Sequence, residues 1–376
     1  MPTFACMHIL YLFNPSHDEA LASGSPYYCP SKTARRVSAQ WATLPALWAS
    51  SEDYVCLPDE VELSTEELAA ATCKFVRWRD LKPSFWQQIA SVEPWGWDPL
   101  VAHSLARKAC PASLLPTDAS LQKIRQLSSR ESCTQLLPAL RLALADEGFA
   151  TVGESFIFRE ASALSLLMQR YGRMVLKSLW SCSGRGVFSV ASPLSPSEEG
   201  RVNKLLREQG GVEAEPYYEG VLDFALEFQV LADGSVVPLG ISMFHTSETG
   251  GYLGNAIAPQ SVLETLILSQ WKMNKSPKEI AQLRSNIESL RETADDMIGN
   301  LQRVCSKVIS TFLAGRYVGM LGIDMMLVKT TAGIMLHPCI ELNLRRTMGH
   351  VAIALQKQNY PSNKLPQCFR GLFSWI

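Results

Sequence analysis

Three oxygen-bearing side chains near the C-terminus have the types and spacing of a metal site. Asp324 lies in the apolar run Gly322–Val328, and Glu341 and Asn343 stand two residues apart in the run that follows. Because residues two apart project from the same face of a strand, we expect these three side chains to meet on adjacent strands. Carboxylate and amide oxygens suit Mg²⁺ better than thiols or imidazoles do. Taken alone, the pattern fits a structural network of acids and arginines equally well.

Basic and glycine-containing segments offer partners for phosphate. Arg345 continues the alternation of Glu341 and Asn343, so its guanidinium is expected beside the metal, where it could hold a phosphoryl group. Lys177 lies in a predicted strand, with its side chain expected to end in the same site as the loop Ser181–Val187 that follows. This loop is rich in Ser and Gly, whose backbone N–H groups can approach phosphate oxygens. The loop lacks the Walker A spacing, and an ordinary hairpin between two strands explains it as well.

The segment Val212–Phe228 combines acids with a strand pattern. Glu215 and Asp223 could hydrogen-bond an adenine amino group and a ribose, and the backbone near Tyr217 and Tyr218 could bind the rest of the base. The alternative is a solvated strand edge.

The elements that must position these residues are short strands and amphipathic helices. Strands are predicted at 155–159, 174–179, 187–191, 212–218, 225–231, 236–242, 321–329 and 333–341. Helices are predicted at 120–128, 132–146, 160–171, 196–208 and 261–314, the last interrupted near 274–277. Such a mixture indicates an α+β arrangement in the C-terminal part.

The first third of the chain has a parallel α/β pattern. A strand at His8–Phe13, a polar loop, a helix at Ser38–Trp48 and a strand at Tyr54–Leu57 follow one another. Ligands of such sheets bind beyond the carboxyl ends of the strands, which is where the loop after Phe13 lies.

Four polar side chains are candidates for holding a substrate. Asn14, His17 and Asp18 lie in the loop after the first strand, and His245 lies before a glycine-containing loop that could line an acceptor pocket. Turn capping by Asn14 and Asp18, with His17 merely solvated, explains the first three residues equally well. For His245, a loop histidine without a function is the alternative.

The composition of the chain argues against several classes of protein. The 376 residues carry 35 Lys and Arg against 36 Asp and Glu, and this balance argues against nucleic-acid binding. No apolar run approaches the ~20 residues of a membrane helix. The ten cysteines are spread evenly without a short Cys/His spacing, which favours buried free thiols in a cytoplasmic protein. We place a domain boundary near Leu115, giving an α/β domain at 1–115 and a second domain at 116–376 with a β-rich subdomain at 151–220.

In order and spacing, the motifs over roughly Ser120–Val351 resemble those of the ATP-grasp superfamily: a strand Lys with a Gly-rich loop, a Glu-containing hinge, an acidic strand and a terminal E-x-N-x-R. The resemblance implies an ATP-grasp fold preceded by a small parallel α/β domain. It also assigns contacts: ATP phosphates to Lys177 and to Ser183, Gly184, Arg185 and Gly186; adenine to Glu215, Tyr217 and Tyr218; ribose to Asp223; and one or two Mg²⁺ ions to Asp324, Glu341 and Asn343.

The chain departs from the family pattern at two points. Ligases of the family commonly carry an upstream Lys on the phosphates, for which Lys123, Arg125 and Arg130 are the candidates here. Many also have an Arg two residues before the metal-binding Asp, where this chain has Gly322. Either Arg345 takes over that duty or the chemistry differs from that of these ligases.

The resemblance implies an ATP-dependent ligase that activates a carboxylate as an acyl phosphate for attack by an amine or thiol, with Arg345 and Lys177 as catalytic residues. The alternatives are a kinase on the same fold and a nucleotide-binding protein without turnover. The expected partners are small molecules, with neither nucleic acid nor membrane, and a homo-oligomer is compatible with the sequence.

Overall fold

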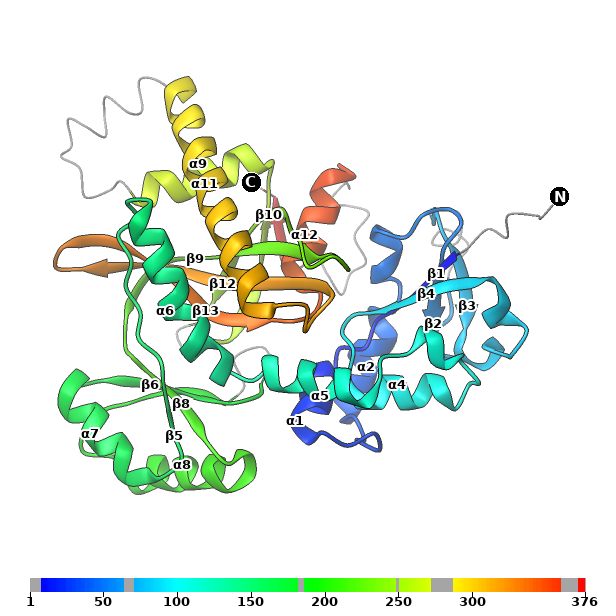
Figure 1. The fold of residues 1–376 in the computed structure, drawn as a ribbon, viewed down its shortest axis with the longest axis horizontal. Helices are drawn as coiled ribbons and strands as arrows, with labels where there is room; N and C mark the ends of the chain where they lie inside the picture. The colour runs from blue at the N-terminus through cyan, green and yellow to red at the C-terminus, as the bar shows by residue number, and fades with distance from the viewer. Residues whose placement is uncertain are drawn as a thin grey trace. The chain divides into compact units, whose positions relative to one another are not determined.

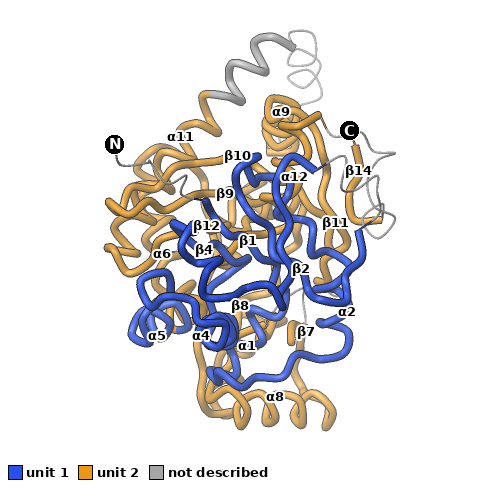
Figure 2. Tube along the Cα trace, turned by 90° about the vertical axis from the view of Figure 1, so that its right-hand side faces the viewer, with its two compact units in different colours: residues 1–125 blue, residues 126–376 orange. Residues whose placement is uncertain are grey.

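The computed structural model describes residues 8–63, 71–181, 186–247, 250–271, 287–359 and 371–375. The chain divides into two compact units, unit 1 at 1–125 and unit 2 at 126–376 (Figure 2). The domain boundary near Leu115 and the domain roles given above stay predictions. None of the described helices has the length and apolar character needed to span a membrane.

Unit 1 is built on a parallel sheet with the strand order β3-β2-β1-β4 (Figure 1). Its strands are β1 (His8–Leu12), β2 (Tyr54–Leu57), β3 (Lys74–Arg77) and β4 (Ile89–Pro94). Its helices are α1 (His17–Ser23), α2 (Lys32–Gln40) and α4 (Pro99–Ala106), and α5 (Asp118–Leu127) crosses into unit 2. Leu10, Val92 and Leu105 belong to one buried core cluster, so the expectation of a parallel α/β unit is confirmed.

Two local predictions in unit 1 are wrong. The predicted polar loop after the first strand contains α1, because His17, Ala20 and Leu21 form a buried stripe at helical spacing. The predicted helix at Ser38–Trp48 is divided: α2 ends at Gln40, and a 3₁₀ turn with Pro45 near its start follows.

Unit 2 begins with a small antiparallel sheet of strand order β5-β8-β6-β7. The strands are β5 (Phe156–Phe158), β6 (Met174–Ser178), β7 (Val187–Val190) and β8 (Val212–Pro216), and the helices are α7 (Ala161–Tyr171) and α8 (Pro196–Gln209). Leu164 of α7 and Val202 of α8 join Leu176 and Val212 in one buried cluster. Both helices therefore pack on this sheet, close to the predicted bounds.

A larger sheet of strand order β13-β12-β9-β10-β11-β14 forms the rest of unit 2. Its strands are β9 (Glu219–Val230), β10 (Val236–Thr246), β11 (Tyr252–Ile257), β12 (Gly319–Thr330), β13 (Gly333–Asn343) and β14 (Phe373–Trp375). The helices are α6 (Glu131–Asp146), α9 (Gln260–Trp271), α11 (Ile287–Leu313) and α12 (Met348–Lys357). Helix α11 lies beside α6 and α9, and α12 packs on β10 and β11 (Figure 1). The predicted interruption near 274–277 falls outside the described residues.

Candidate functional site

Strands β12 and β13 bring the three predicted metal ligands together. Asp324 pairs directly with Glu341 across the antiparallel ladder, and Gly322 pairs with Asn343. The amide Nδ2 of Asn343 donates to Oδ2 of Asp324 at 3.3 Å. The expected juxtaposition of two carboxylates and an amide on adjacent strands is therefore present.

The surroundings of Asp324 disfavour its negative charge. Burial raises the pKa of Asp324 well above its ordinary value, and the carboxylates of Glu341 and Glu227 raise it further. The charge of Arg345 and the hydrogen bond from Asn343 lower the pKa but do not outweigh the first two causes. A cation placed here would relieve this concentration of negative charge.

In the part of the chain that the structure describes, no three His, Cys, Asp or Glu side chains gather as a group that could hold a metal ion. The predicted ligand set has only two residues of these types, since its third member is Asn343. A magnesium site of this composition would draw its remaining ligands from water and substrate phosphate.

A second group of charges is almost completely buried. The Nζ of Lys177 on β6 lies 2.7 Å from Oε2 of Glu215 on β8, and it donates to the carbonyl oxygen of Ile340 on β13 at 3.2 Å. Burial alone would lower the pKa of Lys177, but Glu215 and Glu213 outweigh it and raise that pKa. Lys177 is therefore a permanent cation. In this structure its partner is the side chain of Glu215, which was predicted to hold adenine.

Arg130, one residue before α6, completes this group. Its Nη2 donates to Oε1 of Glu341 at 2.8 Å and to Oγ of Ser181 at 3.1 Å. Its backbone N–H donates to the carbonyl of Leu179 at the end of β6. Arg130 thus contacts both Ser181, at the start of the glycine-containing loop, and Glu341, on strand β13.

The other two upstream cations lie elsewhere. Lys123 is exposed, and Arg125 donates to the carbonyls of Leu21 and Ala22 within unit 1. Of the three candidates for the upstream phosphate contact, only Arg130 joins the group around Lys177.

Glu213 was not predicted as a site residue. Its side chain is fully buried, with Oε2 3.9 Å from both Nζ of Lys177 and Nη1 of Arg130, and Oε1 accepts from Oγ of Ser155 at 2.7 Å. The sequence offered one signal for Glu213: it lies two residues before Glu215, and residues two apart on a strand share a face. Its burial depends on Arg130 and Ser155, which the sequence does not place nearby.

The loop after β6 is described only at its ends. Ser183, Gly184 and Arg185 lie outside the described residues. Gly186 has φ +76, and a Cβ there would lie 2.2 Å from Oγ of Ser178, so only glycine fits this position.

The predicted adenine and ribose residues lie along β8 and β9. Tyr217 is exposed, with the guanidinium of Arg173 3.9 Å from its ring centre, and the ring of Tyr218 meets His337 edge-on. Asp223 accepts from Oγ1 of Thr246 at 2.7 Å. Burial raises the pKa of Asp223 against the effect of this hydrogen bond. Because Asp223 pairs with Met326, two residues beyond Asp324 on β12, it lies along the sheet from the metal ligands.

The predicted substrate residue His245 is exposed near the end of β10. It pairs with Gly254 of β11, and its charge lowers the pKa of Asp223.

A buried network fixes the segment that follows β13. The Oε1 of Glu227 accepts from the hydroxyls of Thr347 and Ser242, and Oε2 lies 3.0 Å from Nδ1 of His350. Thr347 also caps α12 by accepting from the backbone N–H of His350. These contacts hold the segment containing Arg345 against β9, and sequence reasoning did not anticipate them.

The same network accounts for Gly322. A Cβ at this position would lie 2.6 Å from Oε2 of Glu227 and 2.9 Å from Cγ2 of Thr347. The arginine that the resemblance led us to expect at this position would therefore collide with this network.

In unit 1, the polar residues after β1 are tied into the fold. The Nδ2 of Asn14 donates to the carbonyl of Gly96 and to Oδ2 of Asp98, both at 2.8 Å. His17 is 1% exposed, with Nδ1 3.5 Å from Oδ2 of Asp98. Asp18 is half-buried in the first turn of α1. His17 is therefore not a solvated side chain, and Asn14 binds across the sheet to Gly96 and Asp98.

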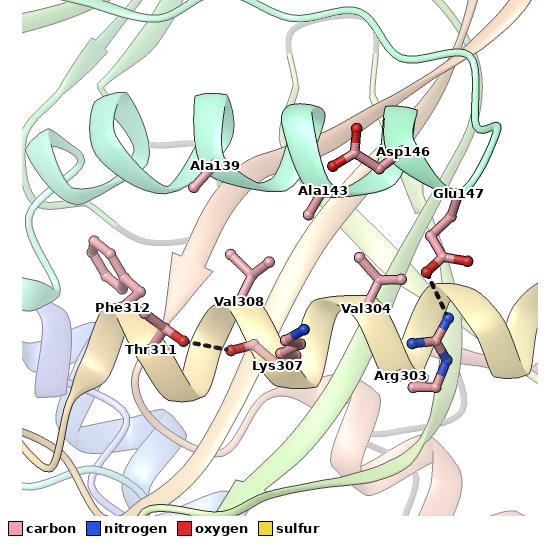
Figure 3. A pocket seen from close by; sticks show the side chains of 10 residues that line it. All are labelled: Ala139, Ala143, Asp146, Glu147, Arg303, Val304, Lys307, Val308, Thr311 and Phe312. Carbon is pink, nitrogen blue, oxygen red and sulfur yellow. Dashed lines mark hydrogen bonds and ion pairs between the residues drawn. The ribbon is translucent and has the colours of Figure 1, made fainter.

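A pocket of about 380 Å³ lies between α6 and α11, away from both charge groups (Figure 3). Ala139 and Ala143 of α6 face Val304 and Val308 of α11, and Glu147 accepts from Arg303 at the rim. None of the candidate site residues lines it.

Comparison with known proteins finds similarity in structure but not in sequence. No family model matches the chain, and no curated protein matches it by sequence. A pyruvate carboxylase variant from Rhizobium etli superposes with a TM-score of 0.50 at 14% identity, over 93% of this chain and 27% of that one.

Two further solved structures are similar at a lower score. Biotin carboxylase from Campylobacter jejuni gives a TM-score of 0.49 at 13% identity, over 97% of this chain and 73% of that one. N5-carboxyaminoimidazole synthetase from Staphylococcus aureus gives 0.44 at 11% identity, over 92% and 73%. Together with the strand orders described above, the similarity to the pyruvate carboxylase structure confirms the predicted fold class: this chain has the ATP-grasp fold.

Proposed function

We propose that this chain binds Mg-ATP on unit 2 and uses it to activate a carboxylate for attack by an amine or a thiol. The observation that carries the proposal is the meeting of Arg130, Lys177 and Glu341 from three distant parts of the chain. Two buried cations beside a strand that presents oxygen ligands form an arrangement suited to a phosphoryl group and its metal ion.

The donor set fits Mg²⁺. Asp324, Glu341 and Asn343 offer hard oxygen ligands, and the mutual repulsion of the two carboxylates favours a cation between them. When bound, Mg²⁺ would neutralise phosphate charge and orient the phosphates. Arg130 would then exchange part of its contact with Glu341 for a phosphate oxygen.

Each remaining residue has a role that follows from its chemistry. Lys177 and Arg130 would bind phosphate oxygens, with Arg130 as the upstream cation of the fold. Gly186 and the loop residues Ser183, Gly184 and Arg185 would cover the phosphates. Asp223, farther along β9, would hold the ribose.

The remaining assignments concern the base, the transferred group and the second substrate. The backbone near Tyr217 and Tyr218 would hold adenine, while Glu215 orients Lys177. Arg345, fixed by the anchored segment before α12, would stabilise charge on the transferred phosphoryl group. His245 and the residues after β1 stay predictions for the second substrate.

The first experiment measures nucleotide binding. Millimolar Mg-ATP should raise the unfolding temperature of the full chain according to RT ln(1 + [L]/Kd), and Asn343→Ala should reduce that rise. The matched control is Asn300→Ala, which removes an exposed amide on α11. No shift in a folded protein would contradict the proposal.

A second experiment separates ligase from kinase. Candidate carboxylates are supplied with and without amines or thiols, and ADP and phosphate release are measured. A ligase requires the second nucleophile for sustained phosphate release, whereas a kinase releases ADP and keeps the phosphate on its product. Binding without either product would indicate a nucleotide-binding protein.

A further inference from the structure

The buried group around Lys177 contains more acids than bases. Its cations are Lys177 and Arg130, and the carboxylates within 4 Å of them are Glu213, Glu215 and Glu341. With all five side chains ionised, three negative charges face two positive ones. An arriving nucleotide phosphate would add further negative charge to the same place.

Glu213 is the least stabilised of the three carboxylates. Glu215 lies 2.7 Å from Lys177, and Glu341 accepts from Arg130 at 2.8 Å with a side chain that is 26% exposed. Glu213 is fully buried and lies 3.9 Å from each cation. Among the described residues its Oε2, like Oε1 of Glu215, has no hydrogen-bond donor, so the longer distances to both cations are what set Glu213 apart. A buried carboxylate oxygen in this position favours the protonated form.

Charged and titratable groups surround Glu213 and its two cations. They are Lys177 on β6, Glu215 on β8, Arg130 before α6, Glu341 and the Cys339 thiol on β13, and the Cys133 thiol on α6. Burial raises the pKa of Glu213 to about 7, with Glu215 adding to the rise and Lys177 and Arg130 opposing it. Glu213 therefore gains or loses its proton near neutral pH.

We propose that Glu213 takes up one proton when the phosphates of a nucleotide bind to Lys177 and Arg130. This inference rests on the proposed function. The proton comes from solvent and forms an O–H bond on the carboxylate of Glu213, without electron transfer. Because bound phosphate shares the field of the two cations, the ionised form of Glu213 loses its main stabilisation, and the protonated form becomes the stable one.

The consequence is a pH-dependent affinity. If Glu213 must be protonated in the complex, the affinity for Mg-ADP falls about tenfold between pH 6 and pH 8, because the free protein increasingly lacks the proton. Glu213→Gln keeps the shape of the side chain without its titration. Its affinity should stay constant within about twofold over the same range.

The experiment is titration calorimetry of Mg-ADP into the full chain at pH 8 in two buffers that differ in ionisation enthalpy. The wild type should take up close to one proton more per bound nucleotide than Glu213→Gln. Any change in the protonation of the nucleotide on binding is the same for both proteins, so it does not contribute to their difference in proton uptake. The control is Glu131→Gln, which removes an exposed acid that pairs with Arg159 and should behave like the wild type.

An infrared measurement on the wild type tests the proposal even if Glu213→Gln fails to fold. Mg-ADP added to the wild type at pH 8 should produce the carbonyl band of a protonated carboxylic acid. Equal proton uptake in wild type and Glu213→Gln, or binding without this band, overturns the role of Glu213 while leaving the proposed function standing. Absence of nucleotide binding at every pH overturns both.

Discussion

The polar cluster behind β1 in unit 1 and the charge cluster around Lys177 in unit 2 are both buried, but they differ in how far their members satisfy one another. In unit 1, the carboxylate of Asp98 accepts from Asn14 and from the backbone N–H of Val101, so that it caps α4. The ring of His17 fits against Gly96, where a Cβ would lie only 2.6 Å away. Each group there has a short-range role in holding the sheet to its helices.

The cluster of unit 2 has three carboxylates against two cations. Among the described residues, its buried Glu213 Oε2 has no hydrogen-bond donor, and Nδ1 of His17 in unit 1 likewise has no hydrogen-bond partner. Such an excess of carboxylates costs stability on its own, and a Mg²⁺ ion at Asp324 and Glu341 together with protonation of Glu213 would relieve it. The comparison therefore separates a structural cluster from a binding cluster on the basis of unmet charge. Variants in both clusters should lower stability, but only variants in the unit 2 cluster should also weaken nucleotide binding.

The largest effect is expected for Lys177→Met. Removing this cation leaves Glu213 and Glu215 buried together without it, which should lower the free energy of unfolding by about 3 to 5 kcal/mol and abolish nucleotide binding. Urea denaturation and the Mg-ATP thermal shift measure the two quantities.

The double variant Lys177→Met with Glu215→Gln sharpens this prediction, because it removes one buried charge along with its partner. Most of the lost stability should return, while nucleotide binding should stay absent. Lys74→Met, at an exposed pair with Glu52, is the control and should leave both quantities close to wild type. Nucleotide binding by the double variant would contradict the role of Lys177.

The fold of unit 2 was largely predictable because apolar alternation is a local signal. Strands β12 and β13 and the meeting of Asp324, Glu341 and Asn343 follow from residues close together in sequence. The partnership of Arg130 with Glu341 spans more than two hundred residues and could not be derived from local patterns.

Several short elements gave too weak a signal to be predicted. Strand β14 has three residues and, among the described residues, pairs with β11 alone, while β4 ends at Pro94 without a clear alternation of apolar residues. Helix α1 was missed because only two turns of its pattern exist. In each case, tertiary packing determined what the local sequence left open.

Asp98→Ala tests the structural cluster. The change removes the cap of α4 and the acceptor for one N–H of the partly buried Asn14 amide, which should lower the free energy of unfolding by about 2 to 3 kcal/mol. The affinity for Mg-ATP should stay unchanged. Loss of affinity in a folded variant would mean that the contrast between the two clusters is false.

The structural and the substrate-binding interpretations of His17 can be distinguished by measuring both the stability and the activity of His17→Ala. A structural role predicts that His17→Ala lowers stability with unaltered steady-state kinetics, and the substrate role predicts weaker use of the second substrate.

Acid should destabilise the protein through His337. This side chain is fully buried, and burial together with the charges of Lys177 and Arg141 lowers its pKa to about 3. In the unfolded chain the ring takes up a proton below pH 6.5, so stability is lost as pH falls from 6.5 toward 3, by about 2 kcal/mol at pH 5. His337→Gln should remove this part of the acid slope, whereas the exposed His245→Gln should keep it. An unchanged slope in His337→Gln would show that the ring titrates normally.

The smallest effect concerns Ser155, which donates to the buried Glu213 at 2.7 Å and lowers the pKa of that carboxylate. Ser155→Ala should cost about 1 kcal/mol of stability, the usual net value of one hydrogen bond. It should also move the fall of Mg-ADP affinity to higher pH, because an ionised Glu213 loses a donor and becomes harder to form. Ser310→Ala, which removes a comparable hydrogen bond to the carbonyl of Gly234, should cost similar stability without moving the affinity profile. A shift to lower pH in Ser155→Ala, or equal profiles in the two variants, would mean that Glu213 does not set the pH dependence of binding.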